Sequence, residues 1–229
     1  MAPNVASSPV EIRCKGVLFD MDGILISSIG SVERSWTRWA EMRGVDPEYA
    51  CKMAHGRRAI ETAALLRPDL DSQAELKLIE DFELADGAGL AVLPGVLALL
   101  QSLPDNCWTV VTSATERLAR LRLAQAGIPL PPHLVTADDV TQGKPDPAPY
   151  LAGAALLGIS PEDCVVFEDA ESGTLAGRAA GCTVIATTFS HQAESLGAAH
   201  YLIEDVTGVR VRHLPGNQGI VMTFSPISE

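Results

Sequence analysis

The stretch GVLFDMDG, residues 16–23, decides the fold. Its first four residues, Gly16–Phe19, form a short run that ends abruptly at Asp20, which is typical of a strand buried inside a sheet. From this strand outward, most of the chain alternates apolar runs with helical patterns. We therefore interpret the stretch as the first core strand of an α/β protein.

Downstream of the helical segments that follow this strand, strands and helices are expected in regular order. The expected strands cover residues 107–112, 134–136, 164–167, 183–187 and 201–203. The helices expected between them cover residues 116–126, 147–157 and 174–180. Alternating strands and helices predict βαβ units, and right-handed crossovers then give a Rossmann-like parallel sheet with helices on both faces.

A purely helical block interrupts this alternation, and no strand is expected from residue 29 to 93. Helical spacing of apolar residues recurs over residues 31–42, 57–66 and 72–85. We expect an α/β catalytic core of residues 10–28 and 94–213, with an inserted all-helical unit of residues 29–93. Residues 1–9 and 214–229 are expected to be flexible or loosely packed, because the tail after His213 lacks helical periodicity.

Composition excludes several classes of function. The 229 residues carry 17 Lys and Arg against 29 Asp and Glu, a formal net charge of −12, and 47% are hydrophobic. Such a chain is globular rather than disordered, and it lacks the basic surface that nucleic acids and anionic membranes require. The five scattered cysteines favour reduced thiols in a cytoplasmic protein. We expect a soluble monomer or weak dimer with no membrane and no nucleic-acid partner.

Carboxylates follow two of the expected strands at the edge where ligands of open parallel sheets bind. Asp20 and Asp22 stand two residues apart after the first strand, so an extended backbone would point both the same way. Glu168 and Asp169 end a later strand. An Asx turn and a helix-start charge pair are the ordinary structural explanations for these two pairs. Clustered carboxylates nevertheless need a cation, and oxygen ligands favour Mg²⁺.

Anion-binding groups are expected at the same edge. Ser113 and Ala114 precede a helix, where a hydroxyl and free backbone N–H groups can bind an anion, although a helix cap would use the same residues. Lys144 lies in the turn GKPDP, although most lysines are simply solvated. Together with a metal ion, these groups predict a site for a phosphate group despite the negative net charge.

The ordered set FDMDG, VVTSA, GKPDP and VVFEDAESG resembles the haloacid dehalogenase superfamily of phosphohydrolases. The resemblance spans Val17 to about Ile203 and is specific because the four motifs occur in order and at the family's spacing. The helical insertion resembles the small cap of the β-phosphoglucomutase-like and sugar-phosphatase branches. The segment HGRRAIET, which starts at His55, is similar to a cap segment of the glycerol-3-phosphatase and 2-deoxyglucose-6-phosphatase group.

The resemblance implies a role for each acidic residue. Asp20 would be the nucleophile that forms an aspartyl-phosphate, and Asp22 would be the general acid and base. Mg²⁺ would be held by the Asp20 carboxylate, the Asp22 backbone carbonyl and Asp169, with Glu168 adjacent. Because Asp22 supplies the proton that an alkoxide leaving group needs, its presence favours phosphate-ester chemistry over dehalogenation.

The resemblance also implies phosphate-binding and cap residues. Ser113, the Ala114 N–H and Lys144 would hold the phosphoryl oxygens. The candidates for reading the leaving group are the cap residues His55, Arg57, Arg58 and Glu61, with at least one of the two adjacent arginines expected to be solvated. Trp36 and Trp39 lie three residues apart on one helix face, which favours core packing over a sugar-stacking platform.

These residues predict a Mg²⁺-dependent phosphatase of small sugar or polyol phosphates. A β-phosphoglucomutase-type mutase using the same aspartyl-phosphate is the first alternative. A non-catalytic binding or regulatory module is the second, favoured only by two departures from the family pattern. These are Ile24, where threonine or valine is usual, and Ser27, where aspartate is frequent.

Overall fold

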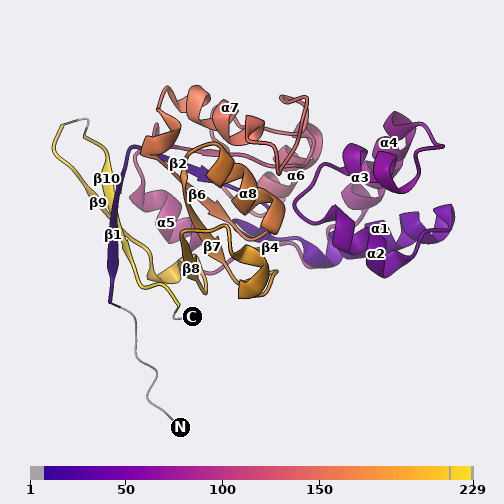
Figure 1. Ribbon diagram of the computed structural model, residues 1–229, viewed down its shortest axis with the longest axis horizontal. Helices are drawn as coiled ribbons and strands as arrows, with labels where there is room; N and C mark the ends of the chain where they lie inside the picture. Colours follow the sequence, from indigo (N-terminus) through magenta and orange to yellow (C-terminus); the bar gives the residue numbers. More distant parts are fainter. Residues whose placement is uncertain (1–7, 217, 228–229) are drawn as a thin grey trace, which may run out of the picture.

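The computed structural model describes residues 8–216 and 218–227, and a five-stranded parallel sheet forms its centre (Figure 1). The strands, in their order across the sheet, are β5 (Trp108–Val110), β2 (Gly16–Phe19), β6 (Cys164–Glu168), β7 (Thr183–Thr187) and β8 (Tyr201–Ile203). All four pairings between neighbouring strands are parallel. The expected Rossmann-like α/β fold is confirmed, although the segment at 134–136 contributes only a single bridge from Val135 to Val111.

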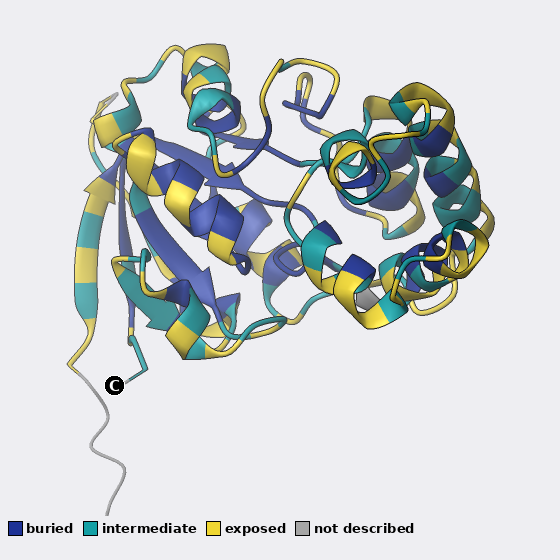
Figure 2. Ribbon diagram, turned by 45° about the vertical axis from the view of Figure 1, so that its right-hand side comes forward, coloured by how far each residue is buried: buried dark blue, intermediate teal, exposed yellow. Residues whose placement is uncertain are grey.

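Helices cover both faces of this sheet, and alternate strand residues point to opposite faces. On one face, Phe19 stacks on Phe167 with ring centroids 5.2 Å apart. That face packs with residues of α5 (Val96–Ser102) and α6 (Glu116–Gln125). On the other face, Leu18 and Val166 pack with residues of α7 (Ala148–Leu157) and α8 (Glu171–Ala179). Figure 2 shows the sheet as a buried layer whose covering helices are exposed on their outer sides.

The C-terminal tail differs from the expectation of a loosely packed segment. Strand β10 (Ile220–Phe224) lies between β1 (Val10–Cys14) and β9 (Arg210–His213) in an antiparallel sheet. Ile220, Met222 and Phe224 are buried in the core. The pairing joins the two ends of the chain, so helical periodicity within the tail could not reveal it. Residues 1–7, 217 and 228–229 of the segments expected to be flexible lie outside the described residues.

Four helices form a separate block beyond the carboxyl ends of the core strands, at the right of Figure 1. They are α1 (Ile29–Arg43), α2 (Pro47–Ala54), α3 (Ala59–Leu66) and α4 (Ser72–Ala85). The block has its own apolar core, in which Trp36 and Trp39 meet edge to face at 5.3 Å, as expected for core packing. At its junction with the sheet, β3 (Ile26–Ser27) pairs with β4 (Ala91–Val92), a short strand that the sequence did not indicate.

Three short 3₁₀ helices complete the described elements: Pro161–Asp163, Ala193–Leu196 and Val206–Gly208. All five cysteines are free thiols. Among the helices of the described chain, none has both the length and the apolar character needed to traverse a lipid bilayer.

Candidate active site

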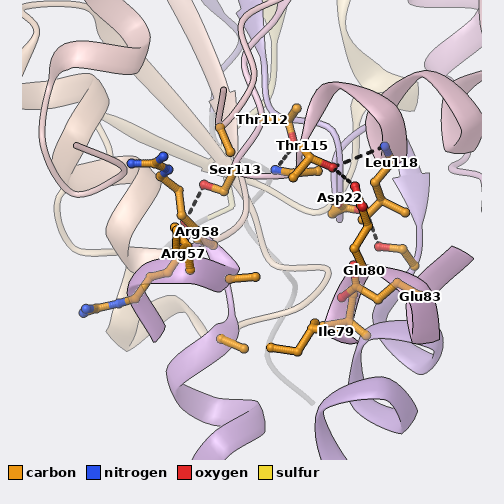
Figure 3. A pocket seen from close by; sticks show the side chains of 18 of the residues that line it. Asp22, Arg57, Arg58, Ile79, Glu80, Glu83, Thr112, Ser113, Thr115 and Leu118 are labelled. Atoms are coloured by element: carbon orange, nitrogen blue, oxygen red, sulfur yellow. Dashed lines mark hydrogen bonds between the residues drawn. The ribbon is translucent and has the colours of Figure 1, made fainter. Parts of the chain in front are cut away.

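A cavity of about 180 Å³ lies between the carboxyl edge of the sheet and the helical block (Figure 3). The core lines it with Asp20, Asp22, Ser113, Ala114 and Asp169. The helical block lines it with Trp36, His55, Ile79, Glu80 and Glu83, among other residues. The strand ends that the sequence singled out therefore meet at one cavity, as the rule for open parallel sheets requires.

Lys144, which does not itself line the cavity, links the first and fourth motif-bearing segments. Its side chain is 1% exposed, and its Nζ donates to Asp20 Oδ1 at 2.7 Å and to Glu168 Oε1 at 2.7 Å. The third bond goes to the backbone oxygen of Val111 at 3.1 Å, so all three ammonium donors are used. Burial alone would lower the pKa of Lys144, but the two carboxylates raise it overall, and the side chain stays charged.

Glu168 is held on both of its oxygens. Besides Lys144, Oε1 accepts a 2.6 Å hydrogen bond from the buried hydroxyl of Tyr150, and Oε2 accepts from the N–H groups of Asp169 and Ala170. A Cβ at Gly173 would lie 1.7 Å from Oε1, so only glycine fits there. The sequence analysis did not identify Tyr150. Its position near the start of the helix that directly follows GKPDP was the feature that could have indicated it.

Asp169 completes a cluster that could hold a metal ion. Carboxylate oxygens of Asp20, Glu168 and Asp169 lie within 4.8 Å of one another, and all three residues are buried. Ser190 donates a hydrogen bond to Asp169 Oδ2. Gly23, at φ +81°, lies against the same carboxylate, and a Cβ at this position would be 1.7 Å from Oδ2.

Burial sets the protonation of this cluster. It raises the pKa of Asp20 to about 7 against the opposing attraction of Lys144. It also raises the pKa of Asp169 well above the ordinary value, and the charge of Glu168 adds to the effect. Three buried carboxylates facing one ammonium leave the cluster short of positive charge. A hard divalent cation such as Mg²⁺ fits both this deficit and the all-oxygen donor set.

Asp22 is oriented by a residue that sequence reasoning also missed. Its Oδ1 accepts hydrogen bonds from the Ser28 hydroxyl and from Arg122 Nη1, the latter at 3.1 Å. Arg122 comes from the buried side of α6, and its side chain is 5% exposed. Its second amino group, Nη2, lies 3.7 Å from Glu83 Oε2 on α4 of the helical block. Burial raises the pKa of Glu83 to about 7.

Of the three phosphate-binding candidates, Ser113 and Ala114 line the cavity, but their polar groups have partners within the chain. Ser113 donates to the backbone oxygen of Gly56 at 3.0 Å, a contact between the core and the helical block. The Ala114 N–H donates to the Thr112 hydroxyl at 3.1 Å, while Thr115 caps the following helix. Ser113 would therefore exchange a contact with the helical block for one with a bound phosphate.

The four candidate cap residues separate into three environments. His55 lines the cavity and packs edge to face on His191 of the core at 5.4 Å. Arg58 Nη1 donates to the Thr141 backbone oxygen at 2.9 Å, and Glu61 accepts from the Gly143 N–H at 2.9 Å. These two residues tie the helical block to the loop that carries Lys144. Glu61 does not line the cavity, which differs from its expected contact with substrate.

Arg57 is exposed, as expected for at least one of the adjacent arginines. In Figure 3, Arg57 and Arg58 lie on one side of the pocket that they help to line, whereas Asp22, Glu80 and Glu83 lie together on its other side. Both arginines nevertheless line the cavity, as His55 does, so their expected contact with the leaving group stays a prediction.

Comparisons with known proteins give a consistent picture. The family model for haloacid dehalogenase-like hydrolases matches residues 14–181. Hexitol phosphatase A of Escherichia coli is 39% identical over 215 residues, covering 92% of this chain and 100% of that protein. Glycerol-1-phosphate phosphohydrolase 2 of Saccharomyces cerevisiae is 35% identical, covering 81% and 80%. The structure of a β-phosphoglucomutase from Clostridium difficile superposes with a TM-score of 0.73 at 17% identity, covering 85% and 92%, a likeness of fold.

Proposed function

The chain belongs to the haloacid dehalogenase-like hydrolases, and we propose that it is a Mg²⁺-dependent phosphatase of small sugar or polyol phosphates. The observation that carries the proposal is the Asp20 carboxylate, which lines the cavity while Lys144 holds one of its oxygens. A buried, oriented carboxylate beside a second one at Asp22 suits nucleophilic displacement at phosphorus. The named phosphatases among its relatives support this substrate class.

The acidic cluster suggests how the metal would be held. Both oxygens of Glu168 are occupied by hydrogen bonds, so Glu168 acts mainly by fixing Lys144 and the backbone after β6. Asp20 and Asp169 would then bind Mg²⁺ together with the backbone carbonyl of Asp22. The bound cation would neutralise charge on the phosphoryl group and on the carboxylates during transfer.

The protein's own residues would carry the two chemical steps. Asp20 attacks phosphorus, forming an acyl-phosphate bond while the ester P–O bond breaks, and Asp22 gives its proton to the departing alkoxide. Asp22 then takes a proton from water, which attacks phosphorus and releases inorganic phosphate and a free Asp20 carboxylate. Arg122 and Ser28 keep the carboxyl group of Asp22 in one position throughout.

The start of α6 would hold the transferring group, and the charge of Lys144 would stabilise it. Lys144 offers a fixed positive charge beside Asp20, while Ser113 and the Ala114 N–H offer hydrogen bonds at the cavity wall. We propose that residues 29–93 act as a cap that closes this site. The Gly56 contacts with Ser113 and Ser172 then mark the point where the cap meets the core.

The two departures from the family pattern do not disturb this arrangement. Ile24 is 2% exposed and packs in the main core cluster, where its size is accommodated. Ser27 pairs with Ala91 at the junction with the cap. Neither residue lines the cavity, so we expect activity to be retained.

The test is phosphate release with Mg²⁺ from a panel of glycerol phosphates, hexose 6-phosphates, 2-deoxyglucose 6-phosphate and phosphoglycolate. Release that EDTA and Asp20→Asn abolish is the expected result. Asp105→Asn is the matched control, because Asp105 is exposed in the turn before β5 at the opposite end of the sheet. Undiminished release by Asp20→Asn would refute the assignment of the nucleophile. Interconversion of β-glucose 1-phosphate and glucose 6-phosphate without phosphate release would instead indicate a mutase.

A further inference from the structure

One wall of the cavity pairs a guanidinium and a carboxylate that still have unused hydrogen-bonding groups. Arg122 Nη2 is buried and, among the described residues, has no hydrogen-bond partner; Glu83 Oε2 lies 3.7 Å from it. That separation is too long for a hydrogen bond. The Glu83 carboxylate, 8% exposed, accepts no hydrogen bond from the part of the chain that the structure describes.

Such a pair is costly unless something else binds there. Buried charged groups are normally satisfied by hydrogen bonds, and each one left unsatisfied costs free energy. Arg122 and Glu83 both line the cavity, so a bound molecule could reach both. The donor comes from α6 of the core and the acceptor from α4 of the cap, so their approach depends on the closed arrangement.

A hydroxyl group can supply both of the hydrogen bonds that this pair does not make within the protein. It accepts a hydrogen bond from the guanidinium and donates one to the carboxylate at the same time. A second anionic group would be repelled by Glu83 and by the nearby carboxylates of Glu80 and Asp22.

The position of the pair also defines which part of the substrate it contacts. The other amino group of Arg122, Nη1, is bonded to Asp22, the residue that would protonate the leaving alkoxide. A group bound at Nη2 is therefore on the leaving-alcohol side of the site. We infer that Glu83 and Arg122 form a hydroxyl subsite that selects monophosphates of polyols bearing a free hydroxyl near the ester. This inference rests on the proposed phosphatase function and names its specificity-determining pair.

The experiment compares two esters with the same three-carbon chain, glycerol 1-phosphate and propyl phosphate. Binding of each with Mg²⁺ is measured by calorimetry on the Asp20→Asn protein, and phosphate release is measured on the parent enzyme. We expect glycerol 1-phosphate to bind at least about 10-fold more tightly, because one hydrogen bond to a charged group has that effect. Adding Glu83→Gln should reduce this preference about 10-fold.

The matched control is Asp81→Asn, which removes one negative charge from an exposed position on the same helix and should keep the preference. No binding preference in the Asp20→Asn protein, an unchanged preference after Glu83→Gln is added, or tight binding of phosphoglycolate would each overturn the subsite. Preferential binding without phosphate release by the parent enzyme would support the subsite while overturning the phosphatase. Glu83→Leu, similar in volume, provides a second variant if Glu83→Gln does not fold.

Discussion

Replacing Tyr150 with phenylalanine removes one hydroxyl from beneath the site and changes nothing else in volume. The hydroxyl donates to Glu168 Oε1 at 2.6 Å, and both residues are 0% exposed, so water cannot replace the lost donor. A hydrogen bond to a charged group contributes about 1.5–3 kcal/mol to stability. The free energy of unfolding should fall by that amount. For a chain of this length, the melting temperature should then fall by about 3–12 °C.

Urea unfolding followed by circular dichroism measures this loss, with Tyr49→Phe as control because Tyr49 is 52% exposed. The measurement is made in EDTA, so that metal binding does not contribute to the difference. Lys144 and two backbone N–H groups still hold Glu168 in the variant, so the fold should persist and the transition should stay cooperative. A Tyr150→Phe protein as stable as Tyr49→Phe would refute the conclusion that Tyr150 stabilises the buried carboxylate.

Two further substitutions test the site and its closure. Asp22→Asn should slow hydrolysis of alkyl phosphates by about 10²–10⁴-fold, because Asp22 would no longer protonate the leaving alkoxide. Hydrolysis of p-nitrophenyl phosphate should be slowed far less, because nitrophenolate leaves without a proton. Equal slowing of both substrates in steady-state assays would argue against Asp22 as a general acid. Arg58→Ala removes the hydrogen bond to Thr141 that ties the cap to the Lys144 loop and should raise KM by about 2- to 10-fold. The exposed neighbour Arg57 provides the control, and an equal KM change in Arg57→Ala would contradict this role.

The sheet and the motif-bearing strand ends could be predicted because their information is local. A buried strand is a short apolar run, and Asp20 and Glu168 mark the carboxyl ends of two such runs. The parallel arrangement then brings those ends to one edge, whatever the intervening sequence contains. The C-terminal strand was not predictable in this way, because Ile220–Phe224 depends on pairing with Val10–Cys14 at the other end of the chain.

Tyr150 and Arg122 escaped prediction for a related reason. Each lies within a helix, where a tyrosine or an arginine is common. The role of each depends on a hydrogen bond to a carboxylate that is far away in the sequence. Arg122 is 100 residues from Asp22 in the sequence, and Tyr150 faces Glu168 across the layer between α7 and the sheet. Motif spacing indicates the groups that we propose to react, but it carries no information about the groups that hold them in position.

The same limit applies to the cap residues, because motif spacing does not reveal which of them also contact the core. A cationic segment beside a phosphate site suggests substrate binding, yet Arg58 bonds to the Thr141 carbonyl, and Arg57 is exposed. A closed cap must be held by polar contacts to the core, and residues at its rim are positioned for that task. Glu83 and Arg122 line the cavity as well, beside the Asp22 carboxylate. These two residues suit the proposed contact with the leaving alcohol, because Arg122 Nη2 has no hydrogen-bond partner and Glu83 accepts no hydrogen bond among the described residues.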